Sequence, residues 1–157
     1  MADASLSCAG AAAEDLPLVR ELFREYEKDI GIDLSFQDFS AELASLPGKY
    51  QEPRGAILLA RRGTDLCGCV AFRPIDDATC EMKRLYVRPA CRSLGVGRAL
   101  VTRLLESARG RGYARIRLDT LPTMVGAIRL YRDLGFREIE PYVYNPVPGT
   151  LFMEKAL

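Results

Sequence analysis

Hydrophobic side chains recur every three or four residues in four parts of the chain, which is the spacing of one buried helix face. Acidic residues open the first part, and a glycine follows both the first and the fourth. Acids favour a helix N-terminus, and glycine favours the position just after a helix. We therefore predict four helices, at about residues 14–30, 35–46, 95–109 and 125–134.

Shorter apolar runs, bounded by polar or glycine-containing segments, predict strands. The first two runs are joined by a polar connector that contains Gly63, so we expect them to form a hairpin. Later strands alternate with helices, which indicates an α/β fold. The predicted strands cover residues 55–60, 66–72, 79–87, 114–118 and 150–153.

Two local motifs allow sharper structural predictions. Residues 35–38 read Ser-Phe-Gln-Asp just before an apolar helical pattern, so Ser35 is expected to cap the helix, with Asp38 completing a capping box. Cys67 and Cys69 are two residues apart in a predicted strand. Because strand side chains alternate, both thiols are expected on one face of the sheet.

Length and composition indicate one domain over residues 1–157. The chain is 48% hydrophobic, which allows one ordinary core at this size. It contains no apolar run of about 20 residues, and its start lacks the basic and apolar segments of a secretory signal. We therefore expect a cytoplasmic protein that does not bind a membrane.

The cysteine and histidine content limits the possible chemistry. The chain has five cysteines without Cys-x-x-Cys spacing and no histidine. Neither a metal site nor a disulfide framework is expected from this set. Acid–base chemistry must then use Glu, Asp, Tyr, Cys or the backbone, because the commonest general base is absent.

Basic residues are concentrated in one segment although the net charge is only +1. Between Lys83 and Arg117 there are ten basic side chains and a single acid, Glu106. The cluster suggests a bound anion, and the alternative is a solvated, arginine-rich helix face. Nucleic acid is not expected, because the nearly neutral chain lacks a broad basic surface. A compact polyphosphate ligand fits better.

A glycine-containing turn follows a predicted strand and opens a predicted helix. Residues 92–97 read Arg-Ser-Leu-Gly-Val-Gly. Glycines let the backbone approach a ligand closely, and the free N–H groups of a helix start attract phosphate oxygens. The alternative is that the glycines serve only helix packing. The pattern is neither the three-glycine dinucleotide motif nor a nucleotide triphosphate loop.

The turn and a later segment together resemble the GNAT superfamily of N-acetyltransferases. Leu-Tyr-Val-Arg-Pro at 85–89 with the turn at 92–97 is similar to its acetyl-CoA signature, and Leu-Tyr-x-x-x-Gly-Phe at 130–136 is similar to its later helix. The resemblance is strong over residues 80–136. It implies an α/β single-domain GNAT fold, with a mixed, mostly antiparallel central sheet of six or seven strands, a splayed strand pair and about four flanking helices.

The resemblance also implies how acetyl-CoA, the cosubstrate, would bind. Backbone amides of the turn would hold the pyrophosphate, and the splayed strand would pair with the pantetheine. Many relatives have asparagine where this chain has Met124, so that polar contact is not expected. The expected cofactor-binding residues are Leu85, Tyr86, Val87, Arg92, Ser93, Leu94, Gly95, Val96, Gly97 and Arg98.

Two catalytic residues are implied by the same resemblance. Tyr131 matches the position whose hydroxyl meets the departing sulfur, and Glu81 has the spacing from the turn at which some members place their base. The alternatives are that Tyr131 is a core residue and that Glu81 only pairs with a neighbouring cation. Cys80 and Cys91 would suit an acetyl-cysteine intermediate. The simpler interpretation is that both cysteines are small, buried hydrophobic residues.

The sequence therefore predicts an acetyl-CoA-dependent N-acetyltransferase that acts by direct attack of an amine in a ternary complex. The first half of the chain is acidic, with 8 basic and 15 acidic side chains in residues 1–82, which favours a small cationic amine as acceptor. The alternatives are a noncatalytic acyl-CoA-binding or sensing module and an α/β interaction domain whose glycines only pack. The resemblance alone implies a possible homodimer.

Overall fold

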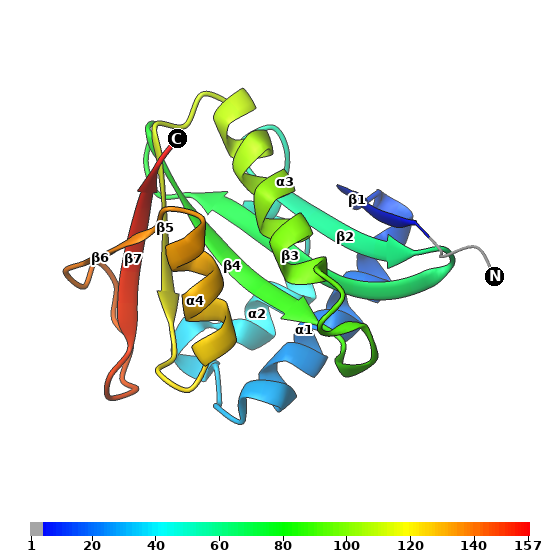
Figure 1. Cartoon of the computed structure of the whole chain (residues 1–157), viewed down its shortest axis with the longest axis horizontal. Helices are drawn as coiled ribbons and strands as arrows, with labels where there is room; N and C mark the ends of the chain where they lie inside the picture. The colour runs from blue at the N-terminus through cyan, green and yellow to red at the C-terminus, as the bar shows by residue number, and fades with distance from the viewer. Residues whose placement is uncertain (1–4) are drawn as a thin grey trace.

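The computed structural model describes residues 5–157, and in these residues seven strands form one sheet in the order β1-β2-β3-β4-β5-β7-β6 (Figure 1). The strands are β1 (Leu6–Gly10), β2 (Ala56–Arg62), β3 (Asp65–Pro74), β4 (Thr79–Val87), β5 (Arg115–Thr120), β6 (Arg137–Ile139) and β7 (Leu151–Ala156). The α-helices are α1 (Leu16–Ile30), α2 (Phe39–Ser45), α3 (Val96–Gly110) and α4 (Val125–Asp133).

The helices cover both faces of the sheet. Figure 1 shows α3 and α4 on one face and α1 and α2 on the other. Each face has its own core: Leu100 and Leu104 of α3 pack against one side, and Leu22 and Phe23 of α1 pack against the other. The predicted α/β fold with a mixed sheet and four flanking helices is confirmed.

Strands β4 and β5 separate after a short stretch of pairing. They are the only parallel neighbours within residues 5–157, and only Thr79–Glu81 of β4 pairs with Arg115–Arg117 of β5. Beyond Glu81, β4 keeps its antiparallel partner β3 but has no partner on the β5 side. This opening is the predicted splay, and it leaves backbone N–H and C=O groups of β4 available to a ligand.

A β-bulge lies in β4 at the start of this opening. Arg84 has φ +63°, and the register against β3 gains one β4 residue there. The extra residue puts Lys83 and Arg84 on the α1/α2 side together, while Leu85 packs on the α3 side. The bulge therefore brings two cations to the same place at the splay.

The predicted capping box at residues 35–38 is wrong. Ser35 begins a short 3₁₀ helix, Ser35–Gln37, and its own N–H donates to Asp33 Oδ1 (2.8 Å). Helix α2 starts at Phe39, and its N-cap is Asp38 in a left-handed conformation with φ +54°. A capping box requires an extended cap residue, and the tight 3₁₀ turn before α2 excludes one.

The prediction that Cys67 and Cys69 share a sheet face is also wrong. Ala60 pairs with Gly68 and Arg61 with Leu66, so Cys67 is the extra residue of a bulge. The two thiols consequently pack into different cores. An inserted residue shifts the alternation by one position, and the sequence pattern gives no sign of it.

Candidate active site

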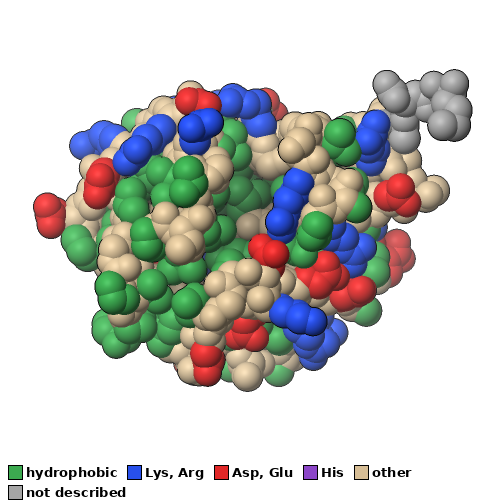
Figure 2. Space-filling model, turned by 60° about the horizontal axis from the view of Figure 1, so that its bottom comes forward, with side chains coloured by type: hydrophobic (Ala, Val, Ile, Leu, Met, Phe, Trp, Pro, Cys, Tyr) green, Lys and Arg blue, Asp and Glu red, His purple; other side chains and the backbone are tan. Residues whose placement is uncertain are grey.

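A large cleft lies where β4, α3 and α4 meet. Its volume is about 700 Å³, and it is lined by strand residues 85–87, the turn at residues 91–97 and the start of α4. Figure 2 shows the surface hollowed near the middle of one face, with hydrophobic side chains inside the hollow and charged side chains of both signs beside it. We call this cleft the cofactor end of the site, because the sequence resemblance predicts that acetyl-CoA binds here.

The turn at the rim of the cofactor end has the geometry of an anion site. Ser93 and Gly95 both have positive φ, +66° and +78°, and α3 begins directly afterwards at Val96. The first backbone N–H that makes an i to i−4 hydrogen bond in this helix is that of Ala99, which donates to Gly95 O (3.1 Å). The N–H groups of residues 96–98 precede it, so they have no intrahelical acceptor and can bind phosphate oxygens.

Most of the predicted cofactor-binding residues line this cleft. The exceptions are Leu94, whose side chain is 46% exposed, and Arg98, which pairs with Asp133 (3.3 Å). Arg92 is held beside the turn by Val87 O (3.0 Å) and Asp29 (3.1 Å). The residues that line it are Leu85, Tyr86, Val87, Arg92, Ser93, Gly95, Val96 and Gly97.

The basic segment seen in the sequence is not a basic patch in space. Arg88 pairs with Glu21 and Glu25 of α1, and Arg111 pairs with Glu52. These acids are distant in sequence but adjacent in the fold. The turn therefore offers an anion its backbone N–H groups more than the side-chain charge of the whole segment.

A second, narrower cavity adjoins the cofactor end in the opening between β4 and β5. Its volume is about 40 Å³, and it shares Tyr26, Ile30, Leu85 and Met124 with the larger cleft. We call it the acceptor end. Because the two ends meet at Leu85 in the splay, ligands that enter from opposite sides come together at β4.

Tyr131, one of the two predicted catalytic residues, lines the acceptor end. It lies on α4, is 4% exposed, and packs against the Phe136 ring (5.6 Å between centroids). Burial raises the pKa of the Tyr131 phenol well above its usual value. The hydroxyl is therefore protonated at neutral pH and available as a proton donor.

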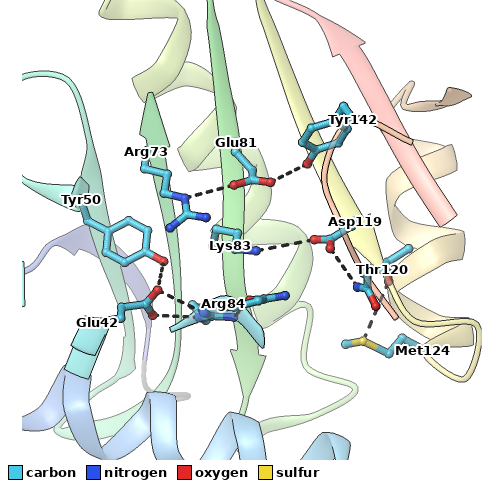
Figure 3. A network of polar contacts seen from close by, with 12 residues as sticks. Glu42, Tyr50, Arg73, Glu81, Lys83, Arg84, Asp119, Thr120, Met124 and Tyr142 are labelled. Atoms are coloured by element: carbon cyan, nitrogen blue, oxygen red, sulfur yellow. Dashed lines mark hydrogen bonds and ion pairs between the residues drawn. The ribbon is translucent and has the colours of Figure 1, made fainter. Parts of the chain in front are cut away.

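Glu81 lies on the same face of β4 as Lys83 but lines neither end of the site. Its carboxylate accepts hydrogen bonds from Arg73 Nε (3.1 Å) and Tyr142 Oη (2.7 Å), and the residue is 3% exposed (Figure 3). Both oxygens thus have a protein partner. A proton from the acceptor end reaches Glu81 only through an intervening group.

A polar network at the acceptor end was not predicted from the sequence. Lys83 Nζ lies 3.7 Å from Asp119 Oδ1, and Asn145 Nδ2 donates to Asp119 Oδ2 (3.0 Å). All three residues line the cavity, from β4, β5 and the loop before β7. A lysine amid an apolar strand was the available signal, because a buried lysine usually has a partner.

Comparison with known proteins identifies this architecture. A family model described as the acetyltransferase (GNAT) family matches residues 16–136. The chain belongs to the GNAT acetyltransferase family. It is 44% identical over 143 residues to an uncharacterized N-acetyltransferase of Schizosaccharomyces pombe, with 89% of this chain and 87% of that relative covered. It is 33% identical over 196 residues to another of Dictyostelium discoideum, covering 86% and 91%.

Solved structures share the fold of this GNAT acetyltransferase. An acetyltransferase from Streptococcus agalactiae superposes with a TM-score of 0.79 at 22% identity, covering 97% of this chain and 98% of its own. A putative acetyltransferase from Salmonella typhimurium, described with its cofactor acetyl-CoA, gives 0.68 at 21% identity, covering 96% and 93%. GNAT enzymes use acetyl-CoA, and the free N–H groups of the turn and the unpaired edge of β4 fit its phosphates and amides.

Cys67 and Cys80 of this GNAT chain are poor nucleophiles. Cys80 is fully buried, and burial raises the pKa of its thiol to about 12. Burial likewise raises the pKa of Cys67 to about 11. A thiol with such a pKa carries almost no thiolate at neutral pH. The small-hydrophobe interpretation of Cys80 and Cys91 agrees with their place in the core.

Two further features are absent from the described part of this GNAT chain. No group of three or more cysteine, aspartate or glutamate side chains within residues 5–157 is arranged to hold a metal ion. Every helix in that range is too short or too polar to span a bilayer.

The Arg84–Glu42 pair is expected to stabilise the acceptor end of the GNAT fold. Arg84 makes two bonds to Glu42 (2.9 and 3.1 Å) and one to Gln37 (2.8 Å), with its side chain 2% exposed. The variant Arg84→Met leaves a buried carboxylate unpaired, so we expect it to lower the free energy of unfolding by about 3–5 kcal/mol. Urea unfolding measures this change.

The double variant Arg84→Met/Glu42→Gln is the matched control. It removes the stranded charge but keeps an acceptor for the Tyr50 hydroxyl, which donates to Glu42 (3.0 Å). We expect it to recover much of the lost stability. If the single and double variants are equally unstable, the pair contributes through packing and not through charge.

Proposed function

We propose that this GNAT enzyme transfers the acetyl group of acetyl-CoA to the amine of a small molecule by direct attack in a ternary complex. One observation carries the proposal: the cofactor end and the narrow acceptor end join at Leu85 and Met124, in the opening between β4 and β5. A thioester that lies along β4 would present its carbonyl there to an amine from the other side. The small acceptor end favours a small acceptor.

The proposed reaction needs a proton acceptor and a proton donor. A neutral amine attacks the thioester carbonyl, so that a C–N bond forms and the C–S bond breaks. Free backbone N–H groups of β4 in the splay stabilise the oxyanion. The amine loses one proton toward Glu81, through water or another group, and Tyr131 donates its phenolic proton to the departing sulfur. No residue becomes acetylated, in agreement with the buried thiols.

Glu81→Gln tests the base. The substitution keeps the shape of the side chain but removes its proton affinity, so we expect kcat at saturating amine to fall roughly 100-fold. Acetyl-CoA affinity should stay unchanged, because Glu81 does not line the cofactor end. The exposed Glu106→Gln is the control, and steady-state kinetics is the measurement. An unchanged kcat with lowered stability would make Glu81 a structural partner of Arg73 and Tyr142.

Release of free coenzyme A thiol, followed with a panel of amines, tests the function as a whole. The proposal requires amine-dependent release from acetyl-CoA. Tight binding of acetyl-CoA without release for any amine would favour the noncatalytic acyl-CoA-binding module instead. Absence of binding would favour the interaction domain.

The acids that suggested a cationic acceptor do not face the acceptor end. Glu21 and Glu25 pair with Arg88, and Glu42 pairs with Arg84. Asp119 is the one carboxylate among the described residues that line the cavity. The acidity of the first half of the chain therefore carries no information about the acceptor.

A further inference from the structure

The ammonium group of Lys83 lacks a hydrogen-bond partner within residues 5–157. Its one ion-pair partner there, Asp119, lies 3.7 Å away, which is longer than a hydrogen bond. The two side chains are 5% and 7% exposed. Burial lowers the pKa of Lys83, and an oxygen acceptor on its donors would stabilise the ammonium form.

The other cationic residue that lines the acceptor end already has partners. Arg84 uses its guanidinium on Glu42 and Gln37, with three bonds of 2.8–3.1 Å. Asp119 is fixed on one side by Asn145, whose own Oδ1 accepts from Val147 N (3.0 Å). Lys83 and Asp119 are therefore the charged groups with spare bonding capacity toward the cavity.

We propose that the acceptor is an α-amino acid, bound with its carboxylate on Lys83 and its amine on Asp119. This proposal rests on the proposed function. Standard bond lengths place the nitrogen and the nearer carboxylate oxygen of an α-amino acid about 3 Å apart. The Lys83–Asp119 separation of 3.7 Å is close to this value, so the two opposite charge pairs lie side by side. The substrate binds as an ammonium ion and loses one proton before the neutral amine attacks. A longer spacing between amine and carboxylate fits the pair less well.

The remaining lining indicates an amino acid with an apolar side chain. Ile30, Ile32, Leu34 and Phe36 contribute hydrophobic surface to the acceptor end. The Phe36 ring also meets the Tyr144 ring edge to face, with 6.5 Å between centroids. These residues come from α1, the segment after it and the loop before β7, and they give an apolar substrate group a surface to contact.

Three matched acceptors test the proposal on the unmodified enzyme. Phenylalanine carries the carboxylate, phenylalanine amide replaces it as in a peptide N-terminus, and phenethylamine lacks it. Leucine, leucinamide and isoamylamine form a second series. We expect kcat/KM to fall roughly 10- to 100-fold when the carboxylate is removed, the value of one charge-assisted contact. Equal kcat/KM across either active series would overturn the proposal.

Lys83→Met tests whether Lys83 binds the carboxylate of the acceptor. The variant should lose the preference, so that the acid, amide and amine differ by no more than about threefold, with Lys28→Met on the exposed face of α1 as control. Lys83→Met leaves the buried Asp119 carboxylate without its ion-pair partner. If this variant unfolds, the same acceptor preference is measured in the double variant Lys83→Met/Asp119→Asn. Retention of the preference in a folded variant would overturn the assignment.

Failure of this proposal and failure of the proposed function give different results. Acetylation of amines without regard to a carboxylate would reject only the amino-acid acceptor. Binding of acetyl-CoA with no acetylation of any amine would reject the proposed function, and the acceptor assignment with it.

Discussion

Replacing Tyr131 with phenylalanine is expected to lower kcat roughly 100-fold while acetyl-CoA affinity stays unchanged. The phenol lines the acceptor end, and burial raises its pKa, so it stays protonated at neutral pH and can donate a hydrogen bond to the departing thiolate. Phenylalanine fills the same space against Phe136 but has no proton to give. Steady-state kinetics and calorimetric titration with acetyl-CoA separate the two effects.

Tyr113→Phe is the matched control for this experiment. Tyr113 is 3% exposed, and its hydroxyl donates to Arg54 O (2.6 Å) away from both ends of the site. Its removal should cost about 1 kcal/mol of stability and leave kcat unchanged. If Tyr131→Phe also leaves kcat unchanged, Tyr131 is a core residue and another group protonates the sulfur.

Replacing Gly95 with tryptophan is expected to weaken acetyl-CoA binding roughly 100-fold or more, the value of at least two phosphate hydrogen bonds. Gly95 stands at φ +78° directly before α3, and a Cβ there meets no protein atom within 4 Å. The open space belongs to the cofactor end. A large side chain would therefore occupy the place of the ligand. Tryptophan in a left-handed backbone conformation would also strain the turn.

Gly112→Trp separates these two effects. Gly112 has φ +89° and equally open surroundings, but it lies in the turn between α3 and β5. It should carry similar backbone strain without loss of acetyl-CoA binding. Calorimetric titration measures the acetyl-CoA affinity of both variants. An equal loss of affinity in both would mean that the turn is not the phosphate site.

Sequence reasoning predicted the turn beside the large cleft because its elements are local. A strand, a turn with Gly95 and Gly97, and a helix follow one another in the chain, so their order alone places backbone N–H groups at a ligand. The same holds for α4, whose helical pattern carries Tyr131 to the splay. Short edge strands were harder: β1 and β6 are five and three residues long and half exposed, so their patterns are weak.

The acceptor end could not be predicted because it depends on distant residues. Lys83 and Asp119 lie two residues beyond Glu81 and Arg117, the last pair of β4 and β5, and Asn145 comes from a later loop. The bulge at Arg84, which places this side chain on the same face as Lys83, leaves no mark in the hydrophobic pattern. The same limitation applies to the basic segment, since its acidic partners come from α1 and other distant elements.

The most direct test of the central claim follows a labelled acetyl group. The enzyme is incubated with acetyl-CoA deuterated in the acetyl group and with a mixture of amines that includes phenylalanine and phenethylamine. The masses of the products are then measured by mass spectrometry. The account predicts an acceptor amine that carries the labelled acetyl group in a 1:1 ratio to released coenzyme A. Bound acetyl-CoA that stays intact with every amine would contradict it.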